Sequence, residues 1–92
     1  MKRYQRIEEK IIGKVINDLG TVNESIPSVD EKKFNIFLTE KDNQYHIAIK
    51  ETMNNPEFEV YYTMFSMENI EKLIHFFAIG LKVSNSKPLK PK

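Results

Sequence analysis

The 92-residue sequence contains no cysteine, only three glycines and only two histidines. Without cysteine, the chain can form no disulfide, no thiolate metal site and no cysteine nucleophile. Three glycines leave little scope for a phosphate-binding loop, and the motifs G-x-x-x-x-G-K-[ST], G-x-G-x-x-G, G-x-S-x-G and H-E-x-x-H do not occur. His46 and His75 belong to no metal-binding spacing. We therefore expect a protein that is not an enzyme and has no cofactor or metal site.

The sequence also lacks a hydrophobic run long enough to cross a membrane. Its most apolar stretch, residues 73–83, is far shorter than the roughly 20 residues that a span requires, and His75, Gly80 and Lys82 interrupt it. The first residues are basic, but no apolar segment follows them. We therefore expect no signal peptide, no membrane partner and a cytoplasmic location.

Length and composition, with 40% apolar and 11% aromatic residues, fit one small globular domain. The net charge of +1 conceals a division along the chain: residues 1–20 carry five basic and three acidic side chains, residues 21–81 five and ten, and residues 82–92 four and none. A chain with basic ends and an acidic middle gives a hint about its binding partners, but this distribution of charge does not indicate the fold. Residues 84–92 are rich in Ser, Pro and Lys. We predict one domain over residues 1–83 and a disordered basic tail over residues 84–92.

Two segments, residues 4–19 and 66–83, have the periodicity of amphipathic helices. Gly20 would end the first helix, and Ser66 is a suitable N-cap for the second. The second segment has apolar residues on two sides. The side expected to pack on a sheet is here called the inner stripe and consists of Ile70, Leu73, Ile74, Phe77 and Leu81. The opposite side is called the outer stripe and consists of Phe76, Ile79 and Val83.

Three segments between the helices, residues 33–39, 45–51 and 58–64, alternate apolar and polar side chains as half-buried strands do. A turn at 41–44 would pair residue 38 with 47 and 36 with 49, and the next loop would pair 49 with 60. Residues 21–31 are expected to form a linker. The predicted fold is α+β: a three-stranded antiparallel meander in the order α-β-β-β-α, with both helices on one face.

This element order is similar to that of double-stranded RNA-binding domains, whose first helix and start of the second contact the duplex. The second helix here begins Ser66-Met67-Glu68-Asn69-Ile70-Glu71, which is acidic where those domains are rich in lysine. The similarity of order therefore implies an arrangement of elements and not a function.

The outer stripe needs a cover of its own, because exposed apolar patches usually mark contact sites. The cover could be the first helix of the same chain, a second copy in a homodimer, or another protein. Our leading hypothesis is a small protein-binding regulator, inhibitor or adaptor. Domains of this size that are rich in Lys, Asn, Ile and Glu are often carried by phages and mobile elements as inhibitors of host enzymes.

We expect two further surfaces to contribute to protein binding. The predicted registers place Phe37 and Tyr61 in one row across the outer face of the sheet. An acidic patch could also imitate phosphates against the groove of a nucleic-acid enzyme. Its members are Asp42, Glu57, Glu59, Glu68 and Glu71.

The alternative hypothesis is nucleic-acid binding. Arg3, Arg6, Lys10 and Lys14 have helical spacing and would form a basic stripe on the first helix. The tail lysines Lys87, Lys90 and Lys92 would add to that charge. A basic stripe is also typical of a solvated helix face, so both interpretations stay open at this point.

Overall fold

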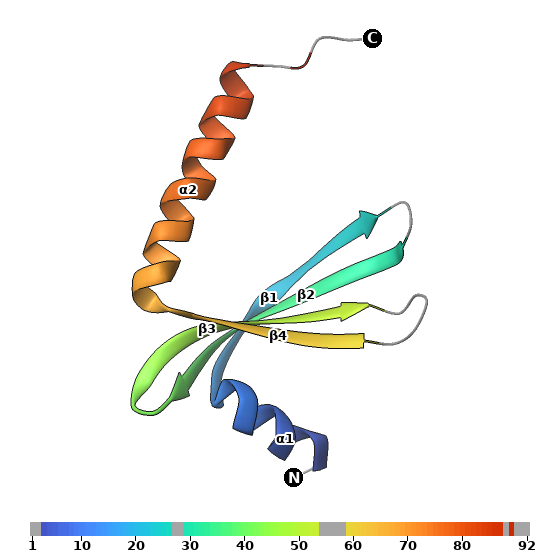
Figure 1. Cartoon of the computed structure of the whole chain (residues 1–92), viewed down its shortest axis with the longest axis vertical. Coiled ribbons are helices and arrows are strands. Elements are labelled where there is room, and N and C mark those ends of the chain that lie inside the picture. The colour runs from blue at the N-terminus through green and yellow to red at the C-terminus, as the bar shows by residue number, and fades with distance from the viewer. Residues whose placement is uncertain (1–2, 27–28, 54–58, 88, 90–92) are drawn as a thin grey trace.

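The computed structural model describes residues 3–26, 29–53, 59–87 and 89. Two helices flank four consecutive strands (Figure 1). The elements are α1 (Arg3–Ile12), β1 (Lys14–Ile26), β2 (Val29–Lys41), β3 (Gln44–Met53), β4 (Glu59–Ser66) and α2 (Met67–Ser86).

The four strands form one antiparallel sheet in the order β1-β2-β3-β4. The predicted β2–β3 hairpin is confirmed, with Ile36 opposite Ile49 and Leu38 opposite Ile47. Its turn has positive φ at Asp42 (54°) and Asn43 (61°). A two-residue turn with left-handed backbone at both positions matches the twist of a hairpin, and Asp and Asn tolerate that conformation.

The first helix is shorter than the sequence indicated, and the prediction of a helix over residues 4–19 is wrong. The helix ends at Ile12, where Gly13 turns the chain with φ 84° and donates its N–H to the Glu9 carbonyl at 2.8 Å. The Lys41 ammonium donates to the carbonyls of Lys10 and Ile11 at 3.1 and 3.0 Å. These bonds satisfy carbonyls that have no partner inside the helix.

The residues after Gly13 form β1, so the sheet has four strands and not the three predicted. Residues 21–26 and 29–31, which were expected to form a linker, lie in β1 and β2. β1 is an edge strand with register shifts between Val15 and Asn17, between Asp18 and Gly20, and between Glu24 and Ile26. Such irregularities break the two-residue alternation that identifies a strand in a sequence.

The register of β3 with β4 also differs from the prediction. Ile49 lies opposite Thr63 and not opposite residue 60. Because a shift by an odd number of residues moves every side chain to the other face, Tyr62 and Met64 share a face with Lys50 and Ala48. β4 carries apolar side chains at both odd and even positions, so its alternation alone could not select the register.

Both faces of the sheet therefore carry apolar side chains, and the two helices contact different ones. α1 buries Ile12 completely, and its Glu8 contacts Lys50 and Tyr62. The first turns of α2 lie against Ile47 and Ile49 of β3, which alternate along the strand with Ala48 and Lys50. Successive strand residues point to opposite faces, so these contacts do not match the predicted arrangement of both helices on one face.

The N-cap predicted for α2 is confirmed. Ser66 has extended backbone, and its Oγ accepts the N–H of Asn69 at 3.3 Å. α2 continues to Ser86, so residues 84–86, which were assigned to a disordered tail, are helical. Residues 88 and 90–92 of that predicted tail lie outside the described residues. No helix in the described part of the chain has the length and apolar character needed to cross a membrane.

Candidate functional site

An apolar groove with a volume of about 350 Å³ lies between α2 and the sheet. α2 follows β4 without a loop and then projects away from the sheet, so the two elements diverge (Figure 1). Every side chain that lines the groove is apolar. The sheet contributes Ile36, Ile47, Ile49 and Phe65, and α2 contributes Ile70, Leu73, Ile74 and Phe77.

The inner stripe of α2 forms one wall of this groove and is only partly covered. Ile70 and Leu73 are half-buried, as expected for residues that pack on a sheet. Ile74, Phe77 and Leu81 are 62%, 66% and 67% exposed. The expectation that the whole inner stripe belongs to the core therefore holds only for the first turns, because the helix axis diverges from the sheet beyond them.

The outer stripe is exposed as well. Phe76, Ile79 and Val83 are 60%, 47% and 46% exposed, so the described part of the chain does not supply the cover that the outer stripe needs. The first helix, which was one candidate for that cover, packs on β1, β2 and β4. α2 consequently presents apolar side chains on two sides.

The predicted row of Phe37 and Tyr61 does not exist. Phe37 is half-buried and lies opposite Ala48, which in turn pairs with Met64. Tyr61 is exposed and pairs with Glu51, three rows farther along and on the other face. The three-residue error in the predicted β3–β4 register accounts for this difference.

The predicted acidic patch is divided between the two ends of the sheet. Glu59 begins β4 and accepts the Tyr61 hydroxyl at 2.7 Å, which raises the pKa of Tyr61. Glu68 lies in the first turn of α2, beyond the other end of β4. Seven residues of extended strand separate these ends by roughly 23 Å. Glu57 lies outside the described residues.

The predicted basic stripe on the first helix is interrupted. Lys10 is exposed on α1, but Lys14 belongs to β1, after the helix has ended at Ile12. The side chains of Arg3 and Arg6 lie outside the described residues. The four residues therefore do not follow one helical face as the sequence spacing suggested.

Glu8 holds α1 to the sheet through two hydrogen bonds that no sequence pattern indicates. Its Oε2 accepts the Lys50 ammonium at 2.9 Å and the Tyr62 hydroxyl at 2.7 Å. Burial alone would raise the pKa of Glu8, but the bonds from Tyr62 and Lys50 outweigh it and lower that pKa. Burial, together with the bond to Glu8, raises the pKa of Tyr62 to about 12.

This contact predicts a loss of stability in alkaline solution. Unfolded Tyr62 ionises near pH 10, whereas folded Tyr62 keeps its proton up to about pH 12. The folded state then binds more protons, so the free energy of unfolding falls as the pH rises from about 10 through about 12. Urea unfolding at pH 9 to 11.5 should show a shallower fall for Tyr62→Phe than for the wild type.

Tyr61→Phe is the matched control, because Tyr61 is exposed and bonds within its own strand. We expect this change to leave most of the alkaline loss in place. An equal slope in wild type and Tyr62→Phe would contradict the assignment to the Glu8–Tyr62 contact.

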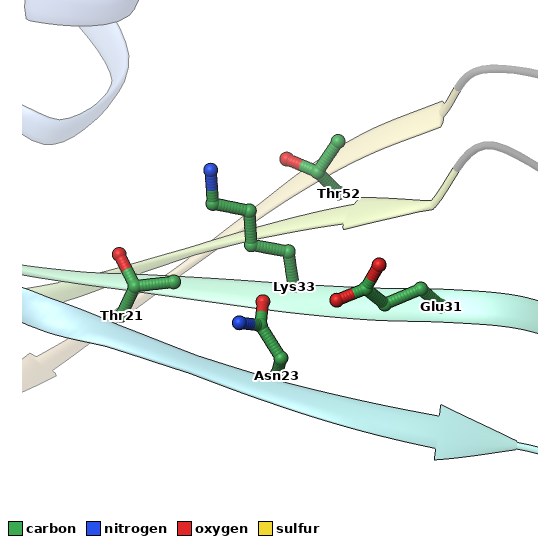
Figure 2. Close-up of a pocket in the computed structure, with 5 residues that line it drawn as sticks. All are labelled: Thr21, Asn23, Glu31, Lys33 and Thr52. Carbon is green, nitrogen blue, oxygen red and sulfur yellow. The ribbon is translucent and has the colours of Figure 1, made fainter.

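A polar hollow of about 390 Å³ lies over β1, β2 and β3 (Figure 2). It is lined by Thr21, Asn23, Glu31, Lys33 and Thr52. The sequence pattern does not reveal this hollow, because residues 21–31 read as a linker, whereas residues 21–26 lie in β1 and residues 29–31 lie in β2. The hollow offers hydrogen-bonding groups and one side chain of each charge, without a histidine or a nucleophile pair that could support catalysis.

The described residues contain no group of three or more His, Cys, Asp or Glu side chains that could hold a metal ion. The candidate site is the apolar surface of α2, where the outer stripe and the later part of the inner stripe are exposed beside the groove. Comparisons with family models, curated proteins and solved structures give no match to this chain.

Proposed function

We propose that this chain is a small protein-binding regulator, without catalytic chemistry of its own, and that it contacts its target through the outer stripe of α2. The observation that carries the proposal is the exposure of Phe76, Ile79 and Val83 along one side of a 20-residue helix. A soluble helix normally keeps one side polar, and an apolar side that the chain leaves open usually marks a contact site.

The outer stripe has the features of a helix that binds in a partner's groove. Its residues follow the i, i+3, i+7 spacing by which one helix face anchors in an apolar groove. Phe76 supplies an aromatic anchor of the kind that dominates binding energy. Glu68 and Lys72, on an earlier turn, form an i, i+4 pair at 3.8 Å that adds polar groups near one end of the stripe.

The proposal does not include imitation of phosphates, because Glu59 and Glu68 lie at opposite ends of β4. It also does not depend on the source of the chain. A regulator or inhibitor that binds a host enzyme would be one form of this function, and the identity of the captured target would decide it.

A photo-crosslinking amino acid at position 79 tests the proposal in cells that express the chain. We expect a crosslinked product that contains a second, different protein. Phe76→Asp should reduce its yield strongly, since loss of a central anchor costs about 2 kcal/mol or more, or at least about 30-fold in affinity. The same crosslinker at position 43, in the β2–β3 turn, is the control and should give no such product.

Two outcomes would overturn the proposal. A product that contains only two copies of this chain would assign the outer stripe to self-association. Crosslinking to nucleic acid and not to protein would instead favour the nucleic-acid alternative, whose affinity should fall steeply with added salt.

A further inference from the structure

The chain exposes more surface than a monomer of its size. Its accessible area is 7711 Å² for a mass of 10.9 kDa. A folded monomer of that mass exposes about 5,600 Å², so the excess is about 2,100 Å². The radius of gyration, 16.3 Å, likewise exceeds the value of about 12 Å for a compact chain of this length.

The excess matches what a stable dimer buries. If each of two copies buried about 2,100 Å², the total would be about 4,200 Å², within the roughly 2,000–5,000 Å² of obligate homodimers. The interior of a single copy is small by comparison: among the described residues, Ile12 and Ala48 are the only apolar side chains that are fully buried. A small domain with so little interior often gains stability by oligomerisation.

The groove and the helix beside it are complementary to each other. The groove is a concave apolar surface of about 350 Å³, and the inner stripe is a convex apolar surface that continues beyond it to Leu81. A two-fold axis brings the same patch of both copies together, so one patch must contain both the projection and the recess. The inner stripe and the groove meet this requirement.

The charge distribution also suits a second copy. Residues 73–81 contain no Asp, Glu, Lys or Arg, and all eight side chains that line the groove are uncharged. Two identical patches that meet across a symmetry axis would repel each other if they carried charge of one sign. A foreign partner selected by charge would instead require charged side chains at this surface.

We infer that the groove is occupied by α2 of a second copy, so that the chain forms a two-fold symmetric homodimer through the inner stripes. Each helix then fills the space between the helix and the sheet of its partner. This contact uses the opposite side of α2 from the outer stripe, and the inference goes beyond the proposed function without depending on it.

The molar mass of the full chain in solution, measured by light scattering at several concentrations, tests this inference. We expect twice the chain mass of 10.9 kDa for the wild type. Ile74→Asp should give the mass of one chain, with an increase in the dimer dissociation constant on the order of 100-fold, because the dimer would bury an unpaired charge. In a single copy Ile74 is 62% exposed, so a monomer would tolerate the change.

Ile7→Asp is the matched control. Ile7 is 55% exposed on α1, away from the groove, and its replacement should leave the dimer mass unchanged. Circular dichroism of both variants establishes whether they are folded. If Ile74→Asp does not fold, the wild type decides the question: a thermal midpoint that rises with protein concentration supports the dimer, and a constant midpoint overturns it.

A wild type with the mass of one chain at tens of micromolar would overturn the inference, as would an Ile74→Asp variant that is folded and still dimeric. Neither result would contradict the proposed function, which is tested separately by crosslinking at position 79. If the chain is a monomer and crosslinks to a different protein, only the proposed function is supported. If the chain is a dimer and gives no such product, only the homodimer is supported.

Discussion

Replacing Ile12 with alanine is expected to lower the free energy of unfolding by about 3 kcal/mol. Ile12 has no exposed surface and is the last residue of α1, where the helix packs on the sheet. Alanine would remove buried methyl and methylene groups and leave a cavity where α1 packs on the sheet. Urea unfolding at a fixed protein concentration measures the effect.

Ile7→Ala is the matched control for this prediction, because the same substitution is made in the same helix at a side chain that is 55% exposed. We expect a loss of less than about 1 kcal/mol there. Equal losses at Ile7 and Ile12 would show that α1 does not pack on the sheet through Ile12.

Replacing Gly13 with alanine should destabilise the chain by about 3 kcal/mol or more. Gly13 has φ 84°, which is unfavourable for a residue with a Cβ atom. The added Cβ would also collide with the Glu40 carbonyl oxygen and would lie 2.7 Å from the Cβ of Lys41. Because Glu40 belongs to the paired strand β2, its backbone cannot move aside without disturbing the sheet.

Two other glycines separate the contributions to this effect. Gly20 also has positive φ, 140°, but a Cβ there would meet no atom within 4 Å, so Gly20→Ala reports backbone strain alone. Gly80 lies in α2 with open space around it, and Gly80→Ala should stabilise the helix by roughly 0.5–1 kcal/mol. If Gly13→Ala costs no more than Gly20→Ala, the close approach of Gly13 to β2 is not present in solution.

Where the pattern of the sequence was regular, it predicted local structure correctly. The alternation of residues 33–39 and 45–51 and the Asp42-Asn43 turn led to the observed β2–β3 register. Ser66 indicated the start of α2, and its hydroxyl caps the helix as expected. Each of these features depends on interactions within one turn or between neighbouring segments, which a sequence specifies directly.

Where the pattern was ambiguous, the prediction failed. The apolar residues Val15, Ile16 and Leu19 fit a continuation of the first helix, but Gly13 ends that helix and the residues after it pair with β2. In β4, apolar side chains at both odd and even positions are compatible with two registers. Pairing with a distant strand decided both cases, and a local window does not contain that information.

The same distinction applies to the candidate site. The sequence by itself determined that α2 has apolar residues on two sides and that the chain has no cysteine chemistry, because both follow from residue identity and helical spacing. Only the tertiary structure decided that α2 diverges from the sheet, that a groove opens between them, and that the outer stripe and the later part of the inner stripe stay exposed. The direction of a helix relative to a sheet depends on packing between residues far apart in the chain, and the exposed area that results is a property of the whole fold.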